Sequence, residues 1–158
     1  MLALAYLITW TTYGTWLPGD DRGWIKAGVR GIQPPDPKRR EKAQMSMVED
    51  AVVLSVEQRR LVEKTIRDHC RIRQWKLHEV NARTNHVHVV VTADRDADTV
   101  MDQFKAWCSR KLSDQAGLTE KVAHKAGRRH WFTEGGDADE IANEDHLANA
   151  IRYVRDGQ

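Results

Sequence analysis

Two histidines separated by one residue are the part of this sequence best suited to chemistry. His86 and His88 lie within residues 85–92, where four valines predict a strand because β-branched side chains suit a pleated, buried surface. Successive side chains of a strand point to opposite faces. Both imidazoles should therefore share one face with Val90, and the other three valines of the strand should lie on the opposite face. Two neutral imidazoles that converge on one point can hold a divalent metal ion.

The same pattern has a simpler explanation. His-x-His is short and common, and its two polar side chains could lie on the solvated face of a half-covered sheet. The spacing alone leaves both interpretations open.

Basic residues beside aromatic residues form a second candidate site. The most basic segment of the chain ends in His130 and is followed at once by Trp131 and Phe132. This arrangement suits a single-stranded nucleic acid, because basic side chains can line up along its phosphates and aromatic side chains can stack on its bases. The two aromatic residues could equally belong to the core of an alternating strand. The predicted DNA-binding residues are Lys105, Arg110, Lys121, Lys125, Arg128, Arg129 and Trp131.

Composition limits the class of protein. The 158 residues carry 25 Lys and Arg against 23 Asp and Glu, so a net charge of +2 does not by itself indicate a polyanionic partner. Cys70 and Cys108 each fall in a helical apolar pattern, where cysteine is more often a small buried hydrophobe than part of a disulfide. With neither a leader sequence nor an apolar run of membrane-spanning length, we expect a single cytoplasmic domain over residues 1–158 that does not enter a membrane.

The elements that must position these residues follow from hydrophobic periodicity and from capping and turn residues. In chain order they are a strand over residues 4–12, an irregular excursion over 20–53, a helix over 55–73, strands over 75–80 and 85–92, a helix from 98 or 99 to about 117, a strand around 131–132 and a helix from about 143 to the end. This order predicts an α+β fold of the ferredoxin-like, split βαβ type, with a mainly antiparallel sheet. Two helices should cover one face, with the histidines and the last helix on the other.

These features resemble the small single-tyrosine transposases of the HUH endonuclease superfamily, including the REP-associated tyrosine transposases. The resemblance rests on residues 13–20 (Tyr-Gly-Thr-Trp-Leu-Pro-Gly-Asp), on Asn85-His86-Val87-His88, on the Phe104-Lys105 pair and on the C-terminal residues 153–158. It covers nearly the whole chain apart from the excursion over residues 20–53.

The resemblance implies a role for each matching residue. His86 and His88 match the metal ligands of the family, with Mg²⁺ or Mn²⁺ as the ion, and Tyr153 on the terminal helix matches the nucleophile. In the insertion-sequence members a glutamine four residues after the tyrosine completes the metal site, but that position here is Gly157. Gln158 comes one residue later, about 140° from the tyrosine around a regular helix, so it could be a ligand only in a distorted last turn.

The implied activity is that of a bacterial transposase. Such an enzyme would nick and rejoin single-stranded DNA at hairpin-containing ends through a metal-dependent 5′-phosphotyrosine intermediate. Two alternatives stay open: a domesticated relative that binds DNA hairpins without cutting them, and a metal-dependent phosphohydrolase that uses water. The oligomeric state is also open, because insertion-sequence relatives act as homodimers while REP-associated relatives can act as monomers.

Overall fold

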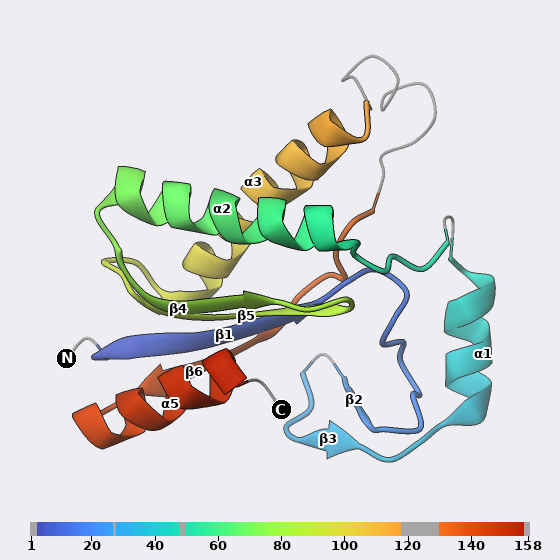
Figure 1. The fold of residues 1–158 in the computed structure, drawn as a ribbon. Coiled ribbons are helices and arrows are strands. Elements are labelled where there is room, and N and C mark those ends of the chain that lie inside the picture. The colour runs from blue at the N-terminus through green and yellow to red at the C-terminus, as the bar shows by residue number, and fades with distance from the viewer. Residues whose placement is uncertain (1–2, 27, 48–49, 118–129, 157–158) are drawn as a thin grey trace.

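The computed structural model describes residues 3–26, 28–47, 50–117 and 130–156. Within these ranges, four strands form an antiparallel sheet in the order β4-β5-β1-β6. The strands are β1 (Ala5–Thr11), β4 (Lys76–Ala82), β5 (His86–Thr92) and β6 (Asp137–Ile141). Helices α2 (Val56–Arg73) and α3 (Ala97–Gln115) cover one face of this sheet, and α5 (Glu144–Asp156) lies on the other (Figure 1). The predicted α+β, ferredoxin-like arrangement is confirmed.

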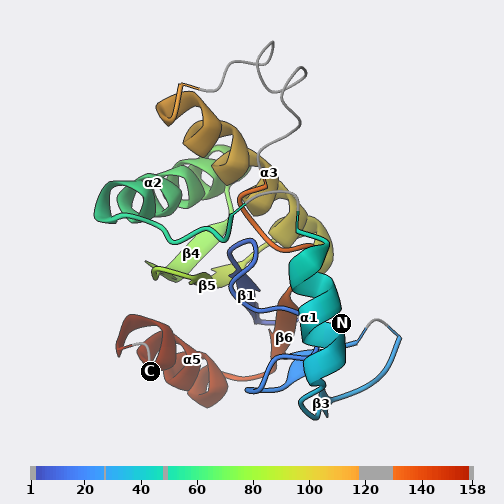
Figure 2. The ribbon, with the colours of Figure 1, turned by 90° about the vertical axis from the view of Figure 1, so that its right-hand side faces the viewer.

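Strand β5 separates the two faces by the alternation expected from its sequence. Val87, Val89 and Val91 are fully buried in the cluster formed with α2 and α3. Val90 belongs to a separate cluster, in which its partners come from α5, β1 and β6. We call the α2–α3 side the closed face and the α5 side the open face. A view turned by 90° shows the same separation (Figure 2).

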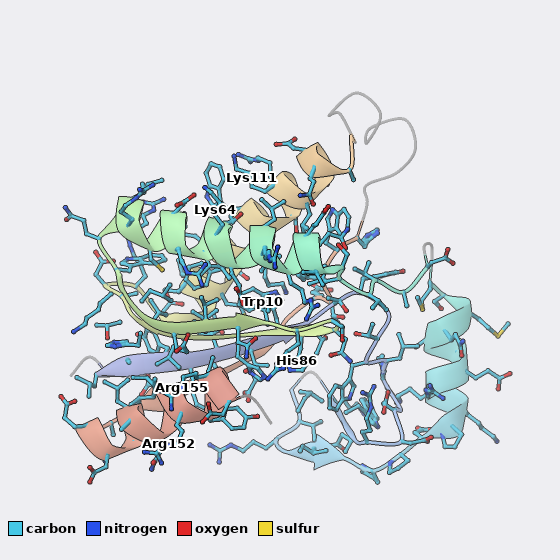
Figure 3. The ribbon with its side chains drawn as sticks, in the orientation of Figure 1. Trp10, Lys64, His86, Lys111, Arg152 and Arg155 are labelled. Carbon is cyan, nitrogen blue, oxygen red and sulfur yellow. The ribbon has the colours of Figure 1, made fainter. Side chains whose placement is uncertain are left out.

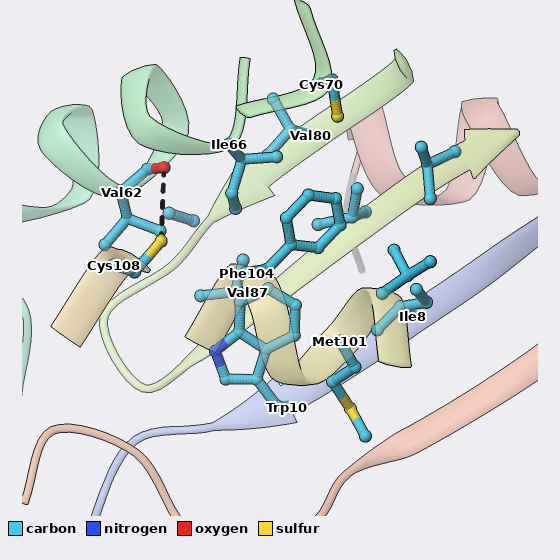
Figure 4. Packing of buried hydrophobic residues seen from close by; sticks show 14 of the residues in the cluster. Ile8, Trp10, Val62, Ile66, Cys70, Val80, Val87, Met101, Phe104 and Cys108 are labelled. Atoms are coloured by element: carbon cyan, nitrogen blue, oxygen red, sulfur yellow. Dashed lines mark hydrogen bonds between the residues drawn. The ribbon is translucent and has the colours of Figure 1, made fainter. Parts of the chain in front are cut away.

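The centre of the closed face is aromatic. The ring of Phe104 lies 6.2 Å from that of Trp10 and 5.9 Å from that of Trp75, measured between centroids. The Cys108 thiol donates a hydrogen bond to the carbonyl of Val62 at 3.8 Å (Figure 4). Both cysteines of the chain are free and buried, as the sequence predicted.

Local signals fixed the ends of the two long helices. Ser55 and Gln58 form the predicted capping box at the start of α2, which ends at Arg73 as expected. Helix α3 begins one or two residues earlier than predicted because the Asp96 carboxylate accepts a hydrogen bond from the backbone N–H of Thr99 and so caps it.

The excursion contains regular structure that the periodicity did not predict. Strands β2 (Trp24–Ile25) and β3 (Ile32–Gln33) form a short antiparallel ribbon, and α1 (Pro37–Met45) follows. None of the residues of α1 is buried, so the helix has no apolar stripe that could reveal it. A capping signal in the sequence could have revealed this helix: Asp36 caps it, and a proline follows at its first position.

Side-chain hydrogen bonds hold this excursion together. The indole N–H groups of Trp16 and Trp24 donate to the carbonyls of Gly23 and Pro34 at 2.7 and 2.8 Å. The guanidinium of Arg22 donates to both carboxylate oxygens of Asp20 at 2.8 Å, and this contact lowers the pKa of the buried Asp20 to about 2. The described residues of this segment therefore have a defined conformation despite their irregular sequence.

The last strand differs from its predicted position. Trp131 and Phe132 lie before it, and Phe132 forms only an isolated bridge with Thr12. Strand β6 begins at Asp137, is an edge strand paired with β1, and buries Ile141. Its sequence, Asp-Ala-Asp-Glu-Ile, has too few apolar residues to predict a strand.

Among the residues that the structure describes, no helix combines the length and the apolar character needed to span a membrane.

Candidate functional site

The two histidines lie side by side on the open face of β5. Their ring centroids are 4.6 Å apart, with the ring planes at 78°. His86 is half-buried and lies at the end of the sheet where β1 leads into the excursion (Figure 3). His88 is only 4% exposed, so it is not the solvated side chain that the simpler interpretation assumed.

Hydrogen bonds orient both rings through the same nitrogen. The side-chain oxygen of Asn85 lies 2.7 Å from Nδ1 of His86, and the hydroxyl of Thr9 lies 2.9 Å from Nδ1 of His88. When Nδ1 donates to such an oxygen, Nε2 keeps the lone pair that can bind a metal ion. Nε2 of His86 is buried and has no hydrogen-bond partner in the described ranges.

The surroundings keep both imidazoles neutral. Burial lowers the pKa of His86, and the positive charge of Arg83 lowers it further. Burial, then the neighbouring His86, and then Arg83 lower the pKa of His88 to about 4. Neutral imidazole is the form that binds metal ions, so both rings are ready to do so at neutral pH.

These observations fit a metal site with two histidine ligands. The orphaned Nε2 of His86 and the oriented ring of His88 suit Mg²⁺ or Mn²⁺, and imidazole favours Mn²⁺ of the two. The described residues contain no group of three or more His, Cys, Asp or Glu side chains that could hold an ion. The predicted third ligand, Gln158, lies outside these residues.

Helix α5 brings Tyr153 to the histidines. Leu147, Ala150 and Val154 bury one side of the helix against the open face, and the side-chain amide of Asn81 on β4 donates to the carbonyl of Val154 at 2.8 Å. The ring of Tyr153 then lies 5.5 Å from that of His88, measured between centroids, with the planes at 75°. Tyr153 remains 48% exposed, so an oligonucleotide can reach it.

Two predicted DNA-binding residues make hydrogen bonds within the protein. Trp131 is 4% exposed and its indole N–H donates to the Ser113 hydroxyl at 2.9 Å, so its ring cannot stack on bases. The ammonium of Lys105 donates to the carbonyls of Thr133 and Gly135, both at 2.7 Å, and burial lowers its pKa. The burial of Trp131 contradicts base stacking by its ring, whereas DNA binding by Lys105 stays a prediction.

Of the remaining DNA-binding candidates, only Arg110 is among the described residues, and it is not brought to the histidines. Arg110 is exposed and stacks 4.6 Å from the ring centroid of Trp107, on α3 and therefore on the other side of the sheet. Lys121, Lys125, Arg128 and Arg129 lie outside the described residues.

Three residues near the site were not predicted from the sequence. Thr9 and Asn81 are both cross-strand partners of His88, and Arg83 acts electrostatically on both histidines. The register of the hairpin over residues 76–92, had it been known, would have placed Asn81 and Arg83 beside the histidines. No sequence signal connects Thr9 with a histidine 79 residues away.

Comparison with known proteins gives the family context of this site. The model of the family described as "Transposase IS200 like" matches residues 41–157. No curated protein matches the sequence.

Among the solved structures that are similar to this chain is a REP-associated tyrosine transposase bound to a REP hairpin, with a TM-score of 0.51 at 11% identity. The alignment covers 98% of this chain and 66% of the other, so this chain spans slightly less than two thirds of that protein. A candidate transposase from Deinococcus radiodurans R1 gives a TM-score of 0.48 at 9% identity, with 99% and 92% of the two chains covered. A score at that level does not establish a shared fold.

Proposed function

The chain belongs to the IS200-like transposase family, and we propose that it nicks and rejoins single-stranded DNA by covalent attachment to Tyr153. The observation that carries this proposal is the 5.5 Å separation between the rings of Tyr153 and His88. At this distance, the exposed phenol lies next to two neutral imidazoles that are oriented for metal binding. Among the reactions that membership of this family suggests, Tyr153, His86 and His88 are best suited to cleavage of a DNA strand by the tyrosine.

The reaction uses the phenol as the nucleophile. The hydroxyl of Tyr153 loses its proton to water, its oxygen attacks phosphorus and forms a new P–O bond, and the bond from phosphorus to the 3′-oxygen breaks. The leaving 3′-oxygen takes up a proton and becomes a 3′-hydroxyl, while the downstream strand stays attached through a 5′-phosphotyrosine. The same hydroxyl can attack in the reverse direction and rejoin the strands, because the phosphodiester bond energy is conserved.

Metal binding by His86 and His88 supports this step. A bound Mg²⁺ or Mn²⁺ ion would polarise the scissile phosphate and neutralise part of its charge. The protein contributes the orientation of both rings through Asn85 and Thr9, and their neutral state through burial.

The proposed DNA partner is a single strand that contains a hairpin. The REP-associated relative with a similar fold is bound to such a hairpin. Hairpins in the DNA that flanks the gene are the natural substrates to test.

The test is a denaturing gel of 3′-end-labelled hairpin oligonucleotides from that flanking DNA, incubated with Mn²⁺. The wild-type protein should give a slowly migrating protein–DNA band, and Tyr153→Phe should reduce it to background because no phenolic oxygen remains. Tyr13→Phe is the matched control, since Tyr13 stacks on His130 at 5.1 Å and not on the histidine pair. It should form the adduct as the wild type does.

Other outcomes would overturn the proposal in recognisable ways. An adduct that survives Tyr153→Phe would place the nucleophile elsewhere. Cleaved DNA without attached protein would indicate a phosphohydrolase that uses water. Hairpin binding without cleavage would indicate a binding module.

A further inference from the structure

Two tryptophans of the excursion have the same local arrangement but differ in exposure. The indole N–H of each donates to a backbone carbonyl within the excursion. The guanidinium carbon of Arg22 lies 4.1 Å from the ring centroid of Trp16. That of Arg39 lies 4.8 Å from the ring centroid of Trp24. Trp24 is 7% exposed, whereas Trp16 is 39% exposed, so packing accounts for the first ring and leaves much of the second in contact with water.

Hydrogen bonds fix the guanidinium of Arg22 over the ring of Trp16. Its Nε and Nη2 donate to the two carboxylate oxygens of Asp20, and Nη2 also donates to the carbonyl of Thr15, all at 2.8 Å. Asp20 is buried and ionised, and a buried carboxylate that loses its counter-charge is strongly destabilising. The side chain of Arg22 is nevertheless 48% exposed. We call Trp16 and Arg22 the Trp16–Arg22 platform, because together they form a rigid stack that is open to solvent.

The Trp16–Arg22 platform lies at the histidine end of the sheet. The backbone N–H of Thr12 donates at 2.9 Å to the carbonyl of Asn85, the residue that orients His86. The hydroxyl of Thr15 donates to the carbonyl of Thr12, also at 2.9 Å, in the turn that leads to Trp16. Figures 1 and 2 show the β2–β3 ribbon beyond this end of the sheet and on the side where α5 lies. A DNA strand on the open face can therefore extend to the platform.

The charges beside the platform favour a nucleic acid as its ligand. The backbone N–H of Asp36, which caps α1, donates to the carbonyl of Gly19 at 3.0 Å, so α1 begins next to the loop that carries the platform. This helix buries none of its residues. It has four basic side chains and one acidic side chain: Lys38, Arg39, Arg40, Lys42 and Glu41. Cations beside an exposed ring suit a single strand, since cations contact its phosphates and the ring stacks on a base.

The exposed ring also favours an unpaired base over a base pair. Both faces of a base inside a duplex are already stacked on neighbouring bases, whereas an unpaired base has a face free for an aromatic ring or a guanidinium plane. The platform offers both kinds of surface.

We propose that the Trp16–Arg22 platform binds one unpaired base of the single-stranded DNA by stacking, while basic side chains of α1 contact the neighbouring phosphates. This inference rests on the proposed function and adds a binding site to it, apart from Tyr153 and the histidine pair. It assigns to Trp16 the base stacking that the buried Trp131 cannot perform. Because every base has a flat face, the platform holds the strand without selecting its sequence.

The experiment separates base stacking from phosphate binding by removing the bases from the DNA. Fluorescence anisotropy measures the affinity for two labelled 12-mers. One is oligothymidylate, and the other has an abasic site in place of every nucleotide. Both carry the same phosphates, so the ratio of the two affinities measures the contribution of the bases. All proteins carry Tyr153→Phe, so that no covalent attachment interferes.

Trp16→Leu should bind oligothymidylate roughly 5- to 100-fold more weakly than the parent, because one base loses its stacking partner. It should bind the abasic oligomer as the parent does, so the affinity ratio should fall by the same factor. Trp16→Phe keeps an aromatic ring but loses the hydrogen bond to the carbonyl of Gly23. It should recover most of the affinity for oligothymidylate.

Trp107→Leu is the matched control. Trp107 is also 39% exposed, and the guanidinium carbon of Arg110 lies 4.6 Å from its ring centroid. It belongs to α3, which covers the closed face. This variant should keep the affinity ratio of the parent. An equal fall of the ratio in Trp16→Leu and Trp107→Leu would overturn the proposal, because the effect would not be specific to the excursion.

A purely structural role of Trp16 would give different results. If the indole only held the excursion together through its hydrogen bond, Trp16→Phe would bind both oligomers as weakly as Trp16→Leu does. Weaker binding of the abasic oligomer by Trp16→Leu would show that α1 had been displaced, and it too would overturn the proposal. A parent protein that binds the two oligomers equally well would refute stacking altogether.

The outcome is independent of the test of Tyr153. If Trp16 carries the preference for bases in a protein that never forms an adduct, the platform is confirmed as part of a DNA-binding module. If the adduct forms but Trp16→Leu keeps the preference, the platform is refuted and the role of Tyr153 stands.

Discussion

The two faces of the sheet are built in different ways from the same strands. The closed face packs β1, β4 and β5 against α2 and α3, with aromatic and branched side chains in continuous contact. The open face has a smaller cluster under α5, and beside it lie polar side chains that hydrogen bonds orient. Stability is concentrated on one face, which leaves the other able to hold groups that chemistry requires.

A row of polar residues across three strands organises the open face. In the register of the sheet, Asn81, His88 and Thr9 are successive neighbours on β4, β5 and β1. Asn81 anchors the last turn of α5, and Thr9 orients His88. The position of Tyr153 relative to the histidines therefore depends on hydrogen bonds of this row as well as on apolar packing.

The largest expected effect lies on the closed face. Phe104→Ala should lower the free energy of unfolding by about 3–5 kcal/mol, because it leaves a cavity between Trp10 and Trp75. Urea denaturation measures this loss. Ile72→Ala on the same face of the molecule is the control, since Ile72 is 72% exposed and should change stability by less than about 0.5 kcal/mol. Equal losses in both variants would contradict the contrast between core and surface.

A smaller effect should come from protonation on the open face. The pKa of His88 is about 4 in the folded protein and about 6.5 in the unfolded chain. Between these values the unfolded chain binds a proton that the folded protein does not, so stability is complete above pH 6.5 and falls as the pH approaches 4. This histidine accounts for about 3 kcal/mol of that loss.

Urea denaturation of metal-free protein at pH 7.5, 6, 5 and 4 measures this dependence. His88→Gln should reduce the loss of stability between pH 7.5 and 4, because glutamine does not titrate. An identical pH dependence in wild type and His88→Gln would contradict the buried, neutral state of the ring.

The smallest expected effect concerns the orientation of His88. Thr9→Val keeps the shape of the side chain but removes the hydroxyl that lies 2.9 Å from Nδ1. Loss of such a partner typically weakens metal binding by 10- to 100-fold, and we expect about tenfold for one ligand of the pair. Titration with Mn²⁺ measures it.

Thr9→Ser separates orientation from packing, because it restores the hydroxyl without the methyl group. It should recover most of the Mn²⁺ affinity lost in Thr9→Val. If serine binds Mn²⁺ as weakly as valine does, Thr9 supports the sheet by packing and does not orient the ring.

Local sequence was sufficient for much of the framework. The valines of β5 predicted which side chains share a face, and Ser55 with Gln58 predicted the start of α2. These signals are reliable because alternation and capping depend only on residues that are close in sequence. Helix α1 and strand β6 were missed because neither buries an apolar stripe of its own.

The contacts of the candidate site depended on the tertiary structure. The sequence identified His86, His88 and Tyr153 as candidates, but it gave no sign that Thr9 would meet His88 across 79 residues. It left the role of Trp131 open, and the structure buries this residue against Ser113 on α3. Which strands become neighbours, and in which register, is decided by how all the apolar faces are buried together, and that information is not contained in any single segment.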